Sequence, residues 1–242
     1  MVYNTDLTNI AYSENYINYR DRVINLVFSE RNKTDENELI NDGLKIISNI
    51  YNTVSDDKNY FCNNVKVFIN DKLIHNYFNL YTQLFFCKNI KYKNGKNYLF
   101  YKEDLYGYSV LDIETNIVFN YYPKATFENN IETFIGTDIH YNNGNLFAVG
   151  GCIWACPYDT LIIKINNPME MFSEFISIHQ MLDKGYKKYE DIDFIEWEVS
   201  NIKLKFENTE LYKPQNEIII LKEEEYKDKL VKINNGVRTN GV

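Results

Sequence analysis

The chain has 242 residues, of which 45% are hydrophobic and 25% charged, so it can bury a substantial core and is not a disordered chain. Its formal net charge of −8 argues against a nucleic-acid surface, because neutralising phosphates requires clustered Lys and Arg. With 21 Tyr and 15 Phe, the composition favours half-buried pleated surfaces and predicts a mainly β fold of the β-rich α+β class.

The first twenty residues lack the basic start and apolar core of a secretory signal, and no run approaches the roughly 18–20 apolar residues of a membrane helix. We therefore expect a cytoplasmic protein that does not bind a membrane. In a reducing compartment the four cysteines are expected to be thiols rather than a disulfide framework: Cys62, Cys87, Cys152 and Cys156.

Residues 1–60 are expected to form a strand and a helix that pack on the main domain. VINLVF (23–28) is the candidate strand. Residues 35–54 carry apolar side chains at helical spacing, and Asp35 with Glu38 can form a capping box, so this segment predicts a helix.

Residues 61–221 predict a domain of antiparallel meanders. Asn70-Asp71 separates two strands of a hairpin, and Asn94-Gly95 is the strongest hairpin signal in the chain. The order strand, Asn-Gly turn, strand, loop, strand recurs around Asn143-Gly144, which indicates an internal repeat. A partial third unit is predicted from strands at 193–199, 201–208 and 217–221.

Two further helices are predicted, so that two or three helices lie at the periphery of the sheets. One begins at Asn167 and ends at Gly185, with His179 on its apolar stripe as a hydrogen-bonded core residue. The other, at 222–232, is short and charged, and it opens a C-terminal region, 222–242, with a loose tail. His75, beside a turn, is expected to be exposed.

The meanders from about 80 to 220 resemble blades of a WD40-like β-propeller in the length of their hairpins. The Gly-His and Trp-Asp dipeptides of that family are absent, and the chain is too short for seven blades of about 40–45 residues each. The resemblance therefore implies stacked or partly wound meander sheets rather than a closed ring.

The stretch GNLFAVGGCIWACPYDTLIIKI (144–165) admits a structural interpretation as a tight corner. Gly150-Gly151 allows positive φ, a bulge or the close approach of another backbone, and Pro157 stops the strand ladder. An exposed Trp154 at this corner would make a good contact anchor. Tyr158 and Asp159 complete the candidate binding residues of the loop.

A catalytic interpretation of the same stretch uses different side chains. Asp138 and His140 share one face of a strand, an arrangement that orients an imidazole for base catalysis, and Cys152 or Cys156 would be the nucleophile, with a depressed pKa. The x3 spacing of the two cysteines also suits zinc. The other ligands of a zinc site lack paired spacing, so we expect neither a metal nor a cofactor. Sequence signatures of NTPases, dinucleotide enzymes, α/β-hydrolases and zinc proteases are absent.

An acidic run at 190–198 offers a second candidate surface. On the strand predicted at 193–199, Glu196 and Glu198 share a face with Phe194, while Trp197 lies on the other. This run is interpreted as a solvated strand face, with a divalent-cation site or a patch for a basic partner as alternatives.

Three blocks together resemble a family of uncharacterised bacterial proteins with a GCxWACPYD-like core: ETFIGTDIHYNN (132–143), AVGGCIWACPYD (148–159) and YEDIDFIEWE (189–198). The resemblance implies a bacterial, cytoplasmic, stand-alone protein and transfers no catalytic residue. Gly151 stands where the family pattern has an acidic residue, which puts a carboxylate role there in doubt.

These observations predict a non-catalytic protein-binding module that presents aromatic and acidic surface to a basic partner, such as an immunity or inhibitor protein for a basic toxin. That last step is an analogy with small acidic bacterial proteins. The alternative is a small enzyme that uses Asp138 and His140 with one of the two cysteines. The predicted binding residues are Trp154, Tyr158, Asp159, Glu196 and Glu198.

Overall fold

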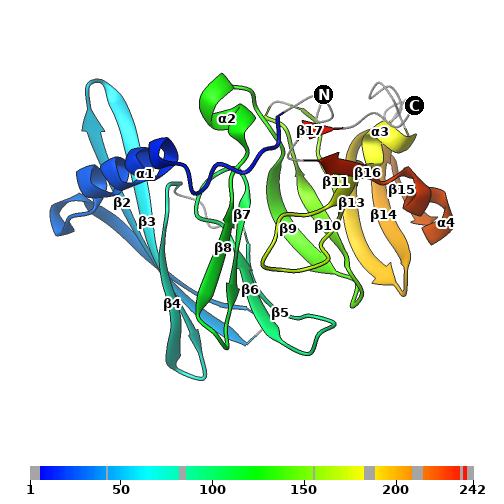
Figure 1. Ribbon diagram of the computed structural model, residues 1–242, viewed down its shortest axis with the longest axis horizontal. Coiled ribbons are helices and arrows are strands. Elements are labelled where there is room, and N and C mark those ends of the chain that lie inside the picture. The colour runs from blue at the N-terminus through cyan, green and yellow to red at the C-terminus, as the bar shows by residue number, and fades with distance from the viewer. Residues whose placement is uncertain are drawn as a thin grey trace. The chain divides into compact units, whose positions relative to one another are not determined.

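The computed structural model describes residues 6–41, 43–81, 86–154, 156–182, 189–208, 215–234 and 237–238. These residues form four antiparallel sheets and a few short helices, which confirms the predicted mainly β class (Figure 1). No closed propeller is found among the described strands. No helix in the described part of the chain is both long and apolar enough to cross a membrane.

The described residues fall into two compact units. Unit 1 holds the residues up to Asn9, the turn Tyr92–Gly95 and the chain from Pro123 onward, whereas unit 2 holds 10–91 and 96–122. The segment Lys58–Ile69 is a single strand that runs through residue 60 and pairs with Leu44–Ser55.

Unit 2 consists of two four-stranded meanders and a helix, α1 (Glu14–Val27), that packs on the first meander (Figure 1). Apolar side chains of both meanders share one core, which includes Val67 and Leu99. The strands, with the single turn η2 (Glu30–Asn32), are β1 (Lys33–Asn41), β2 (Leu44–Ser55), β3 (Lys58–Ile69), β4 (Lys72–Asn79), β5 (Cys87–Lys91), β6 (Asn97–Tyr101), β7 (Tyr108–Asp112) and β8 (Ile117–Tyr121).

Both secondary-structure predictions for residues 1–60 are wrong: the predicted strand is helical, and the predicted helix is a pair of strands. Residues 23–27 end α1, which the Ser13 hydroxyl caps by accepting a hydrogen bond from the backbone N of Tyr16 at 3.3 Å. The predicted helix at 35–54 is instead the hairpin of β1 and β2, which turns at Gly43 with φ +75°. Strand β2 pairs with β3 over its whole length, and this pairing outweighs a helical spacing of apolar residues.

Unit 1 consists of a six-stranded and a three-stranded sheet whose inner faces share a core that includes Ala148, Ile162 and Leu204. Its strands are β9 (Ile135–Tyr141), β10 (Leu146–Cys152), β11 (Asp159–Lys164), β12 (Glu174–Ser177), β16 (Val231–Asn234) and β17 (Val237–Arg238) in one sheet, and β13 (Tyr189–Glu198), β14 (Asn201–Asn208) and β15 (Gln215–Leu221) in the other. Its short helical elements are α2 (Lys124–Asn129), α3 (Ile178–Leu182), α4 (Glu223–Tyr226) and η3 (Lys227–Lys229).

The helix predicted from Asn167 is also wrong, because Phe175 and Ile176 pair with β11 as strand β12 and only α3 is helical. Its predicted end at Gly185 lies outside the described residues, as does most of the predicted loose tail. The predicted charged segment at 222–232 is helical over α4 and η3.

The predicted hairpin turns are confirmed. Asn70, Asp71, Gly95 and Asn143 all adopt positive φ, which Asn, Asp and Gly tolerate best. Strands β5 to β8 and β9 to β12 each form a meander of consecutive antiparallel neighbours, so the repeated order seen in the sequence corresponds to a repeated topology.

Candidate functional site

The connection between β10 and β11 is a tight corner that leaves two aromatic side chains exposed. The pairing of β9 and β10 shifts between Gly150 and Gly151, and a Cβ on Gly151 would lie 2.1 Å from the Ile135 carbonyl oxygen. The glycine pair thus permits a bulge and a close backbone approach, as predicted. Beyond it, the exposed fractions are 58% for Trp154 and 43% for Tyr158.

The backbone of Tyr158 is held by strand β13 and helix α3. Its N–H donates to Oδ1 of Asp191 at 2.7 Å, and its carbonyl oxygen accepts from the N–H of Ile192 at 3.0 Å. The same carbonyl oxygen lies 3.1 Å from Nε2 of His179, the buried histidine that the sequence placed in the core. The Tyr158 ring therefore projects from a fixed backbone position.

Asp159, one of the candidate binding residues of the loop, is buried and supports the corner from inside. Its carboxylate accepts from the Ser177 hydroxyl and from the N–H groups of His179 (3.0 Å) and Thr160 (2.7 Å). Burial raises the pKa of Asp159, and these hydrogen bonds act in the opposite direction. Ser177 also accepts from the N–H of Gln180, which fixes the start of α3.

Asp138 and His140 form the pair that the strand periodicity predicts. Oδ2 of Asp138 lies 2.7 Å from Nε2 of His140. The His140 ring centroid is 4.4 Å from that of Phe194, and the Trp197 indole N–H donates to the His140 carbonyl oxygen at 3.1 Å. The imidazole is thus oriented by a carboxylate and by an aromatic neighbour.

Cys152 does not complete this pair as a nucleophile would. Asp138 and His140 lie opposite Gly150 and Ala148, whereas Cys152 pairs with Ile135 beyond the bulge. Burial raises the pKa of Cys152, and the nearby Cys156 and Asp191 raise it further, which is the opposite of the depressed pKa expected of a nucleophile.

Strand β13 carries the acidic run, and its side chains are divided between the two faces differently from the prediction. The cause is a bulge in its pairing with β14, between Phe194 and Glu196. Phe194 and Trp197 both pack against the core as a result, so Phe194 does not share the face of Glu196 and Glu198. These two carboxylates lie 2.7 and 3.9 Å from the Nζ of Lys203. Much of the predicted acidic patch is therefore paired on its own sheet.

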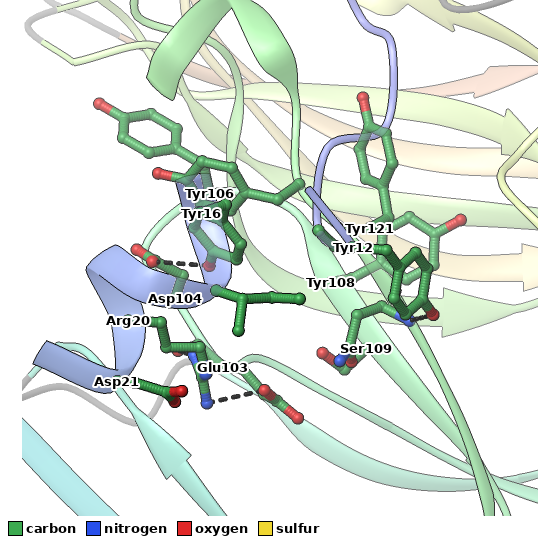
Figure 2. Close-up of a pocket in the computed structure, with 14 residues that line it drawn as sticks. Tyr12, Tyr16, Arg20, Asp21, Glu103, Asp104, Tyr106, Tyr108, Ser109 and Tyr121 are labelled. Carbon is green, nitrogen blue, oxygen red and sulfur yellow. Dashed lines mark hydrogen bonds and ion pairs between the residues drawn. The ribbon is translucent and has the colours of Figure 1, made fainter. Parts of the chain in front are cut away.

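A pocket of about 260 Å³ in unit 2 was not foreseen from the sequence. Figure 2 shows it between α1 and the segment that leads from β6 into β7 and β8. Six tyrosines line it: Tyr12, Tyr16, Tyr106, Tyr108, Tyr121 and Tyr122.

Four charged side chains complete the pocket wall. Nη2 of Arg20 lies 2.7 Å from Oε2 of Glu103, and the Tyr16 hydroxyl donates to Oδ2 of Asp104 at 3.0 Å (Figure 2). Burial raises the pKa of Asp104, while Arg20 and the hydrogen bonds act against the shift. Asp21 is the fourth charged group and is exposed.

Only the adjacent Glu103-Asp104 pair, followed by Leu-Tyr-Gly-Tyr, is a local signal of this pocket in the sequence. The tyrosines lie between positions 12 and 122 and come together through the pairing of strands and the packing of α1. Among the described residues, no group of three or more His, Cys, Asp or Glu side chains is placed to hold a metal ion.

No family model matches the chain, and neither curated proteins nor solved structures show a significant match to it. The resemblances to the GCxWACPYD-like family and to WD40-like blades therefore stay predictions. The two candidate sites of the described residues are the corner of unit 1 that exposes Trp154 and Tyr158, and the tyrosine-lined pocket of unit 2.

Proposed function

We propose that the chain is a non-catalytic protein-binding module for a basic partner, and more specifically a cytoplasmic inhibitor or immunity protein for a basic toxin. The observation that carries the proposal is the exposure of Trp154 and Tyr158 on one corner, whose backbone is held by hydrogen bonds at Tyr158. Trp and Tyr dominate the binding energy of protein interfaces, and a preorganised anchor loses less entropy on binding.

The surroundings of the corner favour a partner of positive charge. Burial raises the pKa of the Tyr158 phenol, and the neighbouring Cys152, Asp191 and Asp193 raise it further. The whole chain carries a formal charge of −8. Electrostatic complementarity of this kind steers association and disfavours acidic partners.

The enzyme alternative has one supporting observation, the 2.7 Å contact of Asp138 with His140. Cys152 is not an activated nucleophile for this pair, because its pKa is raised and it pairs with Ile135 beyond the bulge. The geometry therefore supports binding better than catalysis.

Affinity capture tests the proposal directly. The immobilised protein is exposed to source-cell lysate at moderate salt, and one stoichiometric basic protein is expected to remain bound and to be released by raised salt. With that protein purified, Trp154→Ala is expected to weaken binding by about 30-fold, the effect of a central hot-spot residue worth about 2 kcal/mol.

Ile218→Ala is the matched control, because Ile218 is an apolar residue of unit 1 that is 64% exposed and belongs to the edge strand β15. It is expected to leave the affinity unchanged. The proposal is wrong if Trp154→Ala binds the captured protein as tightly as the unmodified chain does, if Ile218→Ala weakens binding as much as Trp154→Ala does, or if the lysate yields no basic protein.

A further inference from the structure

We infer that the tyrosine-lined pocket of unit 2 is a binding site for a small organic cation, with alkylated ammonium as the preferred class. This inference is independent of the proposed function, since the pocket shares no residue with the corner that carries Trp154. Three features of the pocket support it: its aromatic lining, its charge balance and its size.

The aromatic lining offers several ring systems within a small volume. The rings of Tyr16 and Tyr122 are stacked with centroids 4.4 Å apart, and Tyr106 meets Tyr122 edge to face at 6.5 Å. On the opposite wall Tyr108 packs against Tyr121 at 5.4 Å. Stacking covers one face of Tyr16 and one of Tyr122, which leaves the other face of each for a ligand. An open ring face attracts a cation through its quadrupole, by about 0.5–2 kcal/mol for each favourable contact.

The charge balance of the lining excludes an anion and favours a cation. Asp21, Glu103 and Asp104 stand against the single guanidinium of Arg20, which gives three formal negative charges and one positive. Arg20 pairs with the Glu103 carboxylate and donates to the backbone carbonyl oxygens of Phe78 and Glu103. Its donors are thus directed to the protein itself and not to a bound anion.

Lys102 is close enough to Asp104 for an electrostatic interaction but does not reverse this balance. Its Nζ donates to the Leu105 carbonyl oxygen, and burial lowers its pKa to about 7, so its charge is only partly present at neutral pH. Even a fully charged Lys102 leaves the group with a net negative charge.

The hydrogen bonds of the carboxylates point to a cation that needs few acceptors. Oε2 of Glu103 contacts Arg20, and Oε1 accepts from the Tyr101 hydroxyl at 3.1 Å. Oδ2 of Asp104 accepts from Tyr16, and Oδ1 accepts from the Leu105 N–H at 2.6 Å. Each of these oxygens already has one partner and so offers fewer lone pairs to the N–H groups of an ammonium, whereas the negative charge of the carboxylates attracts an alkylated cation as well.

The size of the pocket sets the scale of the ligand. At about 260 Å³ it lies just below the roughly 300–1,000 Å³ of sites for drug-sized molecules. It therefore suits a single cationic head group with its alkyl substituents rather than an extended ligand.

Titration calorimetry of the full chain with tetramethylammonium chloride tests the inference, with neutral tert-butanol as a probe of similar shape and ammonium chloride as a donor-rich cation. Tetramethylammonium is expected to bind at least tenfold more tightly than either, and its affinity is expected to fall as sodium chloride is raised. Equal binding of tert-butanol, stronger binding of ammonium, or no binding of tetramethylammonium overturns the inference.

Variants locate the site. Asp21→Asn removes an exposed charge of the lining, and Tyr106→Leu removes a ring; each is expected to weaken tetramethylammonium binding about three- to tenfold. Asp71→Asn, in the β3–β4 turn, and Phe28→Leu, an exposed ring at the C-terminal end of α1 that is not part of the lining, are the matched controls and should bind normally. If the controls weaken binding as much as the lining variants do, the cation is bound elsewhere and the inference is wrong.

Discussion

His75 shows how one local irregularity changes the chemistry of a side chain. The pairing of β3 with β4 shifts between Val67 and Phe68, and this bulge places His75 opposite the buried Val67. The ring lies 5.4 Å from that of Tyr77, and its Nε2 is 2.8 Å from the Tyr101 hydroxyl. The prediction that His75 is exposed is therefore wrong, and burial lowers its pKa to about 4.

His75 is expected to make the protein less stable in mild acid. The folded-state pKa of about 4 lies below the value of about 6.5 in an unfolded chain, so between these pH values the unfolded state binds the extra proton. The stabilising contribution is complete above pH 6.5 and is lost as the pH falls towards 4. After allowance for partial exposure, we expect His75→Gln to remove on the order of 1–2 kcal/mol of this pH dependence.

Urea denaturation of both proteins at pH 7.5 and 4.5 measures this difference. Gln is the conservative choice because its amide can donate or accept a hydrogen bond at the Tyr101 hydroxyl. The other titrating groups are common to both proteins and cancel in the comparison. If the two proteins lose the same free energy of unfolding between these pH values, His75 does not carry the effect.

At the scale of the strands, the type of an element and the face on which a side chain lies depend on bulges and pairing partners as well as on the periodicity of the sequence. The turns at Asn94-Gly95 and Asn143-Gly144 could be predicted, because positive φ is a local demand that few residues meet. The helix predicted at 35–54 could not be rejected locally, because its apolar residues fit both a helical stripe and the pairing of β2 with β3. In β13 a single bulge moves Phe194 to the face opposite Glu196.

The candidate sites also divide into those that the local sequence could predict and those that it could not. Asp138 and His140 could be paired from strand alternation, which is local. The burial of Asp159 depends on Ser177 and His179, and the tyrosine pocket depends on residues more than a hundred positions apart. Contacts of that kind arise from tertiary packing and leave no periodic signal.

The bulge of β9 against β10 gives a direct test of strand geometry. Gly151→Ala is expected to lower the free energy of unfolding by about 1–3 kcal/mol or more, because the new Cβ would lie 2.1 Å from a backbone oxygen of Ile135, which cannot move as a side chain would. Gly150→Ala is the matched neighbour, because a Cβ there meets nothing within 4 Å. It should change stability by no more than about 0.5 kcal/mol.

Thermal or urea unfolding of the two glycine variants measures the contrast. Equal stability of the two would mean that the backbones at this bulge are not as close as the structure places them. Because the bulge directs the chain into the Trp154 corner, Gly151→Ala is also the variant of the pair that should weaken partner binding.

At the scale of the whole molecule, charge and anchor residues have separate kinetic roles in the proposed function. The net charge of −8 acts over several ångströms and affects how fast a basic partner arrives, whereas Trp154 acts only after contact and affects how long it stays. The paired carboxylates Glu196 and Glu198 contribute to the long-range field but gain little from a local contact, since each already faces Lys203.

This separation predicts opposite kinetic signatures for two kinds of variant. Asp56→Asn with Asp57→Asn removes two charges in the β2–β3 turn, where both residues have positive φ that Asn tolerates. With the captured basic partner, surface plasmon resonance at low salt should show a slower association rate and an unchanged dissociation rate. Trp154→Ala should raise the dissociation rate at least tenfold and leave the association rate within about twofold. An association rate that does not respond to the charge variant or to salt would mean that the partner is recognised by shape and apolar contact alone, and that the acidity of the chain has no part in binding.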